Sequence, residues 1–506
     1  MQVLQDKYRP YLDGEKIEAL FMFQAGTVWA SMDSVYRNCI SDERFDVKLA
    51  LIVETTVESS HMIGAREYLE KEKINYCMYE ELDFNSYCPH IVFIQFPYDA
   101  ACHTPETLSL QFKRRGSRVI YIPYGIEISD TKLARKDHFS SFVVENAWRV
   151  YTCCEGIKEE YEKYCRNREA VRVCGSPKFD GVANKHLFSI ENSLLEKING
   201  RKIIVWKIHF PKKINENGCI KQITPDIQEY IKFAKELDNY KDLFFIVLAH
   251  PKMLKGVVAS DVQGDDSLMK QVNELIEILE SKENAAIDAS DEYRNSLYNA
   301  DAIIMDRSGV LVEAAMLDVP ILFMTNKKYT EKMTVPVQNI VDSFIQGTTY
   351  KNMMDFISDF QNSLDVMAVK RRDSLKSNFP LADGDCGKRI KIDIIESLHE
   401  KTEKPWVVLY GTGEICRYYM EKQKWGENSK FNLVAVADSN RAKWGTVYYG
   451  IPIVSAEKLK QIAFDAIVIT TEPHYFEIKK SLVYEYYLDE RKIWRLDEFI
   501  VQLDLV

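Results

Sequence analysis

One stretch of the chain, residues 300–323, combines residue types that bind a nucleotide diphosphate. It reads ADAIIMDRSGVLVEAAMLDVPILF, with a polar break between two apolar runs of strand length. Asp306 or Ser308 can cap the helix that follows, and Gly309 allows the backbone to approach a ligand closely. The amides at the start of such a helix attract phosphate, and Arg307 adds a fixed cation with planar donors. The stretch therefore predicts a phosphate site, with an ordinary strand–helix–strand crossover as the alternative.

The helix predicted over 310–317 adds a carboxylate. Glu313 stands roughly one to two turns inside it, where a carboxylate can accept hydrogen bonds from ribose hydroxyls. A phosphate site next to an acceptor for sugar hydroxyls indicates a nucleotide-diphosphate ligand.

A histidine follows another buried strand. The run Leu243–Ala249 is fully apolar and ends in His250-Pro251. Open α/β sheets bind ligands at the carboxyl ends of their strands. His250 can therefore act as a general base or lie as an imidazolium beside a phosphate. The alternative is a strand-end histidine that bonds a loop carbonyl.

Further polar or glycine-bearing breaks follow the predicted strands of both halves. They contain Gly175 and Ser176, Lys207 and His209, and Tyr124 and Gly125. Each has a simple turn or a solvated side chain as its alternative. As a group they predict two sheet edges that face each other across an interdomain cleft.

Strand-like runs alternate with helical segments along the whole chain, which is typical of parallel α/β architecture. The predicted strands are Val47–Val53, Ile91–Phe96, Val119–Tyr121 and Val171–Cys174, then Lys202–Trp206, Leu243–Ala249, Ala302–Met305 and Ile321–Met324. The polar segment Asp180–Gly200 is interpreted as a linker. These patterns place an N-terminal domain at 1–185 and a nucleotide-donor domain at 200–400.

A third unit, residues 404–506, opens with a glycine-rich turn. Gly411-Thr412-Gly413 joins a strand at Val407–Tyr410 to a helix at Glu414–Gln423, and Cys416 replaces the third glycine of the dinucleotide fingerprint. Asp438 ends the next strand, where a ribose-binding carboxylate would lie. The pattern predicts a Rossmann-like domain with a nucleotide site at Gly411, Gly413 and Asp438, its ligand unidentified.

The composition argues against several classes of partner and site. The chain has 506 residues, of which 46% are hydrophobic and 28% charged, and its net charge of -10 argues against nucleic acid as a partner. The 11 cysteines include no C-x-x-C pair, which disfavours zinc ribbons and fits a reducing cytosol. The polar N-terminus and the lack of an apolar run of ~18 residues predict a cytoplasmic protein without signal peptide or membrane span.

These motifs resemble the CDP-glycerol glycerophosphotransferase family, which includes teichoic-acid primases and polymerases. The resemblance covers about Thr27 to Phe379 and is carried by GSPKFD at Gly175–Asp180, by His250-Pro251 and by DRSGVLVEAAMLDVPILF at Asp306–Phe323. It implies a glycosyltransferase-B-like pair of Rossmann-like domains. It also implies attack by an acceptor hydroxyl on the β-phosphorus of CDP-glycerol or CDP-ribitol, with release of CMP. The C-terminal unit is similar to Rossmann-like modules appended to polysaccharide-biosynthesis enzymes.

The resemblance assigns roles to individual residues. His250 matches a histidine at the nucleotide phosphates, and Ser308 and Gly309 match the residues that cradle the diphosphate. The family's N-terminal domain usually carries a His-Gly pair whose histidine serves as base, whereas this chain has Tyr124-Gly125. A tyrosine, with an ordinary pKa near ~10, is a poorer base. Asp99, His103 and His209 are the candidate substitutes.

The leading hypothesis is therefore a polyol-phosphate transferase with a lipid-linked or capsular glycan acceptor, in peripheral contact with the inner membrane face. We expect transfer to need neither a metal nor a cofactor, with Arg307, His250 and helix amides neutralising the phosphate charge. Two alternatives remain: a glycosyltransferase-B enzyme that uses a sugar nucleotide, and a catalytically inactive nucleotide-binding scaffold.

Overall fold

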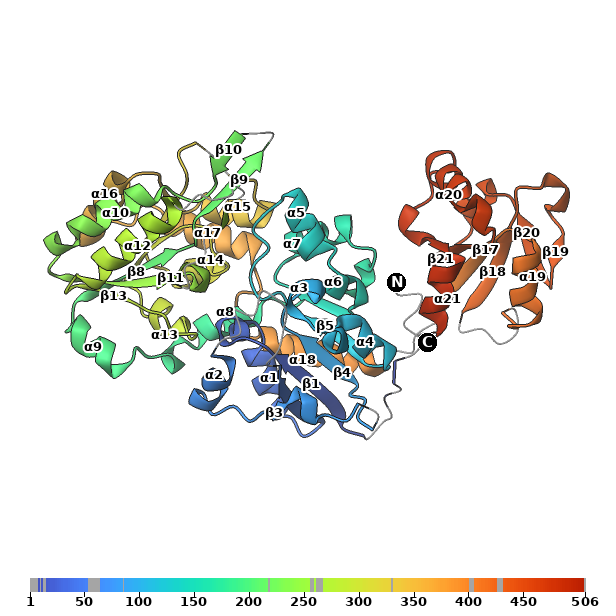
Figure 1. The fold of residues 1–506 in the computed structure, drawn as a ribbon, viewed down its shortest axis with the longest axis horizontal. Helices are drawn as coiled ribbons and strands as arrows, with labels where there is room; N and C mark the ends of the chain where they lie inside the picture. The colour runs from blue at the N-terminus through green and yellow to red at the C-terminus, as the bar shows by residue number, and fades with distance from the viewer. Residues whose placement is uncertain are drawn as a thin grey trace. The chain divides into compact units, whose positions relative to one another are not determined.

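The computed structural model describes residues 8–9, 11, 15–52, 64–84, 86–216, 219–254, 259–260, 267–328, 331–399, 405–425 and 431–504. The chain divides into two compact units. The larger comprises residues 14–109 and 119–395 and contains two parallel sheets, each the centre of one domain (Figure 1). The smaller is built around residues 396–506 and contains a third sheet. Among the described residues, no helix has the length and apolar character that crossing a bilayer requires.

The first sheet forms the N-terminal domain. Within the described residues it has seven strands in the order β3-β2-β1-β4-β5-β6-β7. They are β1 (Ile17–Phe23), β2 (Phe45–Leu51), β3 (Cys77–Met78), β4 (Ile91–Ile94), β5 (Arg118–Tyr121), β6 (Arg149–Thr152) and β7 (Val171–Val173). The predicted strands for β2, β4, β5 and β7 are confirmed to within two residues at each end, except that Val53 lies outside the described residues.

The second sheet forms the next domain. In the described part of the chain its six strands run in the order β13-β11-β8-β14-β15-β16. They are β8 (Lys202–Ile208), β11 (Leu243–Ala249), β13 (Ala285–Ile287), β14 (Ala302–Met305), β15 (Ile321–Met324) and β16 (Ile345–Gly347). All four strands predicted here are confirmed. A small separate sheet contains β9 (Lys212–Glu216), β10 (Cys219–Gln222) and β12 (Ala259–Ser260).

Helices cover both sheets. The N-terminal domain has α1 (Asp33–Ile40), α2 (Ala65–Lys71), α3 (Asp99–Cys102), α4 (Ser109–Arg114), α5 (Lys132–Ala134), a π-helical turn (Arg135–Phe139), α6 (Phe142–Asn146) and α7 (Glu155–Tyr164). The second has α10 (Ile227–Glu236), α11 (Pro251–Leu254), α12 (Ser267–Glu280), α13 (Arg294–Leu297), α14 (Leu311–Met316), α15 (Val335–Val341), α16 (Tyr350–Gln361) and α17 (Ala368–Asn378).

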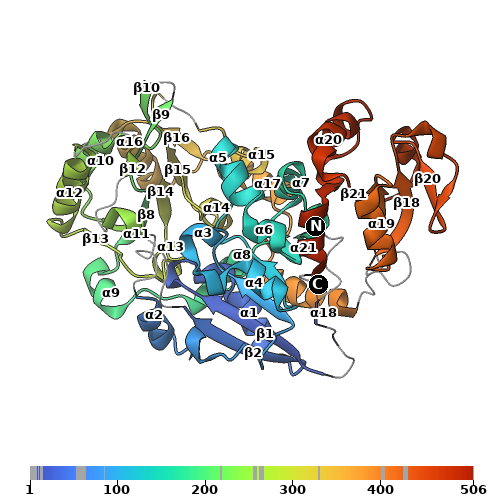
Figure 2. The same cartoon turned by 45° about the vertical axis from the view of Figure 1, so that its right-hand side comes forward.

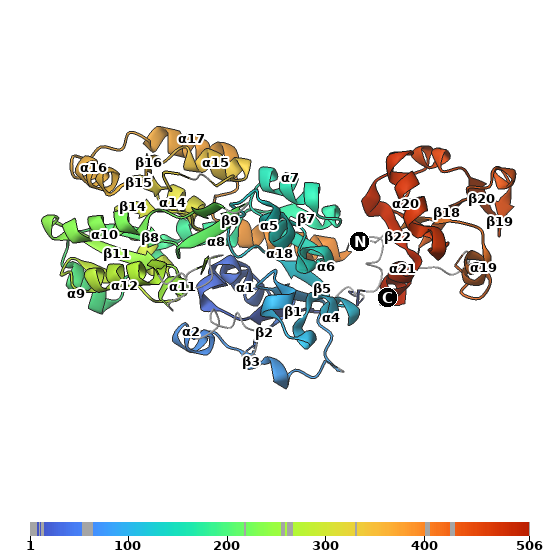
Figure 3. The same cartoon turned by 45° about the horizontal axis from the view of Figure 1, so that its top comes forward.

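The amphipathic helices α10, α12 and α16 pack on one face of the second sheet (Figure 3). Trp206 and Phe245 of the sheet are fully buried there against Phe233 of α10. This apolar core keeps β8, β11 and β14 in register, so that their carboxyl ends meet at one edge.

The segment 180–200, interpreted from the sequence as a linker, contains helical structure, and Asp180 is the one polar residue in it that is buried. The chain forms α8 (Pro177–Ala183) and α9 (Asn192–Ile198), and α8 packs against both α1 and α14. The carboxylate of Asp180 accepts hydrogen bonds from Ser34 Oγ at 2.7 Å and from the backbone amides of Cys386 and Gly387 at 2.8 and 2.7 Å. The sequence alone does not show such bonds, because the partners of Asp180 lie far away along the chain.

The end of the predicted donor domain contacts the N-terminal domain. Helix α18 (Cys386–His399) was expected to end that domain, but its first part joins the N-terminal domain (Figure 2). Asp393 accepts a 2.6 Å hydrogen bond from the Tyr151 hydroxyl of β6, and Lys391 pairs with Asp42 at 2.8 Å. The periodicity of a helix shows which of its faces is apolar but not which sheet that face covers.

The smaller unit is a separate α/β domain. In its described part the sheet order is β19-β20-β18-β17-β21-β22, parallel apart from the β19–β20 pair. Its strands are β17 (Trp406–Tyr410), β18 (Asn432–Ala437), β19 (Val447–Tyr448), β20 (Ile451–Val454), β21 (Ala466–Ile469) and β22 (Ile493–Arg495). Its helices are α19 (Glu414–Glu421), α20 (Tyr475–Tyr484) and α21 (Leu496–Asp504). The predicted strand–turn–helix–strand order at its start is confirmed.

Candidate functional site

The candidate site lies at the carboxyl edge of β11, β8 and β14. These strands are neighbours, so the residues that follow them come together, as the sequence predicts. The rings of His209 and His250 have centroids 5.0 Å apart, and Phe210 packs edge-on against His250 at 4.8 Å. Lys207 donates a 3.1 Å hydrogen bond from Nζ to the carbonyl of Leu248.

Asp306 positions this edge instead of capping the next helix. Its side chain is 1% exposed and accepts hydrogen bonds from the backbone amide of His209 and from the Tyr230 hydroxyl, both at 2.9 Å. Burial raises the pKa of this carboxyl above its usual range, and burial also lowers the pKa of nearby Lys207. The alternative of Asp306 as a cap is therefore wrong; Ser308 Oγ accepts a long 3.4 Å bond from the amide of Val310.

His209 and His250 differ in which ring nitrogen carries the proton, as assigned from their hydrogen bonds. His209 Nδ1 lies 2.8 Å from the carbonyl of Phe210, so Nδ1 carries the proton and Nε2 is the acceptor of the neutral ring. Burial, and then the charge of Arg307, lower the pKa of His209 to about 3. His250 Nδ1 accepts from the amide of Lys252 at 3.1 Å, which makes Nε2 its donor. The pair thus offers one acceptor and one donor.

Arg307 is held at the contact between the two domains. It forms a 2.7 Å ion pair with Glu331 and donates a 2.6 Å hydrogen bond to Ser129 Oγ of the N-terminal domain. Ser129 and Met333 form an antiparallel bridge that joins the domains at this point. The Arg307 side chain remains 27% exposed. A guanidinium anchored in this way is a fixed cation for a phosphate group.

The loop after β5 meets the loop after β14. A Cβ added at Gly309 would lie 3.4 Å from Cα of Gly125, so the two backbones are in contact. The hydroxyls of Tyr124 and Tyr98 are 2.9 Å apart and both rings are half-buried. The structure thus brings Tyr124 and Gly125 next to the segment Asp306–Gly309.

Nothing in the sequence singles out His138, which also lies near this contact between the domains. It lies in the π-helical turn, half-buried, with its ring 5.8 Å from that of Tyr98. The charge of Arg307 reaches it strongly enough to affect its pKa. A π-helical turn has no sequence signature, so only the tertiary structure reveals this histidine.

Glu313 lies in a buried network, and this geometry does not favour the predicted ribose contact. The carboxylate is 1% exposed and accepts hydrogen bonds from the hydroxyls of Tyr293 and Tyr298 at 2.8 and 2.9 Å. Lys178 of α8 forms a 2.7 Å ion pair with it and a 3.1 Å hydrogen bond to the carbonyl of Gly309. Glu313 thereby holds Lys178 against the backbone at Gly309.

Gly175 and Ser176 are packed beneath α18. Gly175 has φ +84°, and an added Cβ would lie 2.5 Å from Cys386 Sγ and 3.0 Å from the carbonyl of Leu381. Ser176 is 8% exposed and precedes α8. Among the described contacts, Gly175 therefore has a steric role, and the predicted donor contact of both residues stays a prediction.

We expect Gly175→Ala to lower the free energy of unfolding by about 2–4 kcal/mol, because backbone strain and overpacking add. Gly200→Ala is the matched control, since Gly200 has φ +73° with nothing within 4 Å of an added Cβ. It should cost only about 1 kcal/mol, from the left-handed backbone alone. Urea denaturation of both variants measures the difference, and equal costs would contradict the packing at Gly175.

Two of the candidate substitute bases are buried. Asp99 accepts hydrogen bonds from the amide and the hydroxyl of Ser109 at 3.1 and 2.5 Å. His103 is 3% exposed, with Nε2 3.3 Å from the carbonyl of Phe96, and burial lowers its pKa. Of the three, only His209 lies at the edge described above.

The glycine-rich turn of the smaller domain is built around Asp438. Asp438 accepts from the amide of Thr412 and from Lys443 Nζ, both at 3.1 Å, and from the amide of Asn440 at 2.8 Å. Burial opposes ionisation, but these bonds outweigh it and hold the pKa of Asp438 below its usual range. Gly411 has φ +102°, and a side chain there would collide with Thr471, whereas the space beside Gly413 is open. Nucleotide binding at this turn stays a prediction.

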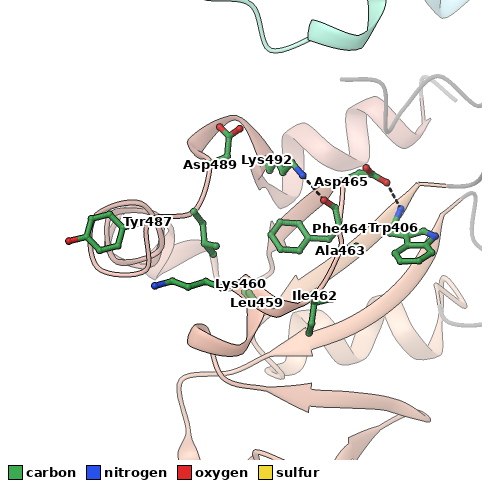
Figure 4. A pocket seen from close by; sticks show the side chains of 11 residues that line it. Trp406, Leu459, Lys460, Ile462, Ala463, Phe464, Asp465, Tyr487, Asp489 and Lys492 are labelled. Carbon is green, nitrogen blue, oxygen red and sulfur yellow. Dashed lines mark hydrogen bonds between the residues drawn. The ribbon is translucent and has the colours of Figure 1, made fainter. Parts of the chain in front are cut away.

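An open pocket of about 790 Å³ lies at the other edge of this sheet (Figure 4). Its lining includes Trp406 at the start of β17, Asp465 just before β21 and Lys492 just before β22. Asp465 bonds the amide of Trp406 at 2.8 Å, and Lys492 bonds the carbonyl of Phe464 at 2.7 Å. These polar groups are satisfied internally, and the pocket is distinct from the predicted nucleotide site.

In the described part of the chain, His, Cys, Asp and Glu side chains form no group of three placed to hold a metal ion.

Comparisons with known proteins show which folds the chain resembles. The model of a family described as C2185-like, N-terminal, matches residues 403–494, which cover most of the smaller domain. No curated protein shows significant sequence similarity to the chain.

Solved structures match the chain over about three quarters of its length. MnaA of S. aureus, in a co-structure with UDP, is 14% identical with a TM-score of 0.51, and the match covers 77% of this chain and 98% of MnaA. A Listeria monocytogenes protein described as a UDP-N-acetylglucosamine 2-epimerase is 15% identical with a TM-score of 0.50 and the same coverage. The wall teichoic acid polymerase TagF is 12% identical with a TM-score of 0.49 over 79% of this chain and 92% of TagF. The chain thus has a glycosyltransferase-B-like pair of Rossmann-like domains and a third, smaller Rossmann-like domain.

Proposed function

We propose that the chain transfers glycerol phosphate, or another polyol phosphate, from a CDP-activated donor to a hydroxyl of a glycan or teichoic-acid-like acceptor. The observation that carries the proposal is the cluster of Arg307, His209 and His250 at one sheet edge, facing the loop of Tyr124 and Gly125. One cation, one hydrogen-bond donor and one acceptor suit a diphosphate whose charge grows during transfer.

The reaction uses these groups on opposite sides of the cleft. The acceptor oxygen forms a bond to the β-phosphorus, the bond from that phosphorus to the bridging oxygen breaks, and CMP leaves with the electron pair. Arg307 and the Nε2 donor of His250 stabilise the charge on the phosphate oxygens. The acceptor is proposed to be a lipid-linked or capsular glycan at the inner membrane face, where the protein would bind peripherally.

A thermal-shift panel tests the donor site. CDP-glycerol, CDP-ribitol and CMP should each raise the melting temperature, because a ligand at 100 times its Kd stabilises the native state by about 2.7 kcal/mol. Arg307→Ala should lose most of this shift. Arg372→Ala is the matched control, because Arg372 is an exposed arginine of α17 that pairs with Asp318 at 3.0 Å. A shift that survives in Arg307→Ala would remove Arg307 from the donor site.

The same panel separates the alternatives. Stabilisation by UDP-sugars alone would replace this proposal with a sugar-nucleotide glycosyltransferase. Binding of CDP-polyols without CMP release across a broad acceptor panel would favour an inactive scaffold. NAD is included for the smaller domain, where a nucleotide near Gly411, Gly413 and Asp438 remains a second proposal; loss of an NAD shift in Gly413→Val would support it.

A further inference from the structure

His138 lies in the N-terminal domain beside Tyr98 and within electrostatic reach of Arg307. Its π-helical turn, Arg135–Phe139, is a geometry that proteins use frequently at functional sites. The half-buried ring packs edge-on against Tyr98, whose hydroxyl is 2.9 Å from that of Tyr124. Neither ring nitrogen of His138 has a hydrogen-bond partner among the described residues, so both are available to a ligand.

The turn that carries His138 is held rigidly. Arg135 donates to Asp130 from Nε and Nη2 at 3.0 and 2.7 Å, and Asp130 also pairs with Lys332 of the second domain. Ser140 Oγ donates to the carbonyl of Arg135 at 2.9 Å, and Phe139 is fully buried. A histidine fixed on such a support loses little conformational entropy when it meets a substrate.

The charges around His138 link its proton affinity to an anion in the cleft. Burial, and then the charge of the Arg307 guanidinium, lower the pKa of His138 to about 4, so the ring is neutral at pH 7. The other polar groups around it are the Tyr98 hydroxyl, Asp137 of the same turn and the Arg135–Asp130 pair. A diphosphate bound at Arg307 would offset that positive charge and raise the pKa of His138 toward neutrality.

We infer that His138 receives the proton of the acceptor hydroxyl in the transfer reaction. The inference rests on the proposed function and supplies the base that Tyr124 replaces in the resembled family. As the acceptor oxygen bonds the β-phosphorus and CMP leaves, the hydroxyl proton passes to a ring nitrogen of His138. The Tyr98–Tyr124 hydroxyl pair lies beside the ring and orients the acceptor. His209 and His250 remain on the donor side.

The test compares CMP release and donor affinity in the full chain. His138→Ala should lower kcat by about 100-fold or more, as loss of a general base does, with the CDP-glycerol Kd unchanged within about threefold. Added imidazole should restore at least about tenfold of the lost rate, which a purely structural defect would not show. His186→Ala is the matched control, since His186 is exposed on a 3-10 turn, and should keep wild-type turnover.

Each outcome is decisive. A His138→Ala enzyme that keeps wild-type kcat overturns the inference, and so does a loss of kcat that imidazole leaves unchanged. A loss confined to donor affinity would place His138 in binding, not proton transfer, and also overturns it. Failure of the wild-type chain to release CMP with any acceptor would instead overturn the proposed function, and this inference falls with it.

Discussion

His250→Ala is expected to lower turnover by about 10²–10³-fold, the usual loss when one preorganised donor to transition-state charge is removed. The amide of Lys252 donates to His250 Nδ1, which places the ring proton on Nε2, the donor that we propose for a phosphate oxygen. Alanine has no group that can replace it. Steady-state CMP release with a CDP-polyol donor measures the loss, once an acceptor has been found.

His250→Gln provides the conservative comparison. A glutamine amide reaches about as far as Nε2 and can still donate, so this variant should keep a larger share of turnover than alanine. Both variants should unfold near the wild-type temperature, because His250 is half-buried at a strand end. Turnover in His250→Ala within about threefold of wild type would remove His250 from the mechanism.

The second large effect concerns stability. Lys178→Met should lower the free energy of unfolding by about 3–5 kcal/mol, because it leaves the buried carboxylate of Glu313 without its cation. Lys178 is 5% exposed and Glu313 is 1% exposed, and their charged atoms are 2.7 Å apart. Urea denaturation measures the cost. Lys202→Met is the matched control: Lys202 pairs with Asp301 at the same 2.7 Å but its side chain is 67% exposed.

The control should cost no more than about 1 kcal/mol, because exposed ion pairs are screened by water. The double variant Lys178→Met with Glu313→Gln should recover much of the loss, since the amide oxygen still accepts from Tyr293 and Tyr298 without a buried charge. A small cost for Lys178→Met would contradict the structural role of the pair. It would return Glu313 to consideration as a ribose contact.

Much of the fold could be predicted because parallel strands buried on both faces are almost wholly apolar. Leu243–Ala249 and Ala302–Met305 were predicted with their observed limits. Strand β1, IEALFMF, was not predicted, although it lies inside the first sheet between β2 and β4. Its leucine, alanine and methionine also suit a helix, and only pairing with β2 and β4 makes it a strand.

The candidate site also has features that the sequence predicted and features that it did not. The sequence placed His250, Asp306 and Arg307 correctly at strand ends, because strand ends follow from local apolar runs. It did not show that Asp306 positions His209, or that Lys178 engages Glu313. Those contacts join residues far apart in the chain, and no local sequence pattern shows which distant residue a side chain contacts.

By itself, then, the sequence determined the α/β architecture and the sheet edge on which Asp306 and Arg307 lie. These depend on hydrophobic periodicity and on the chemistry of single turns, which are local properties. The tertiary structure decided which polar residues support the fold and which face the cleft. Asp180, Glu313 and Asp99 are satisfied inside the protein, whereas His138 lies beside Tyr98 on a π-helical turn. Burial and long-range pairing set these roles, and both are fixed only when distant segments pack together.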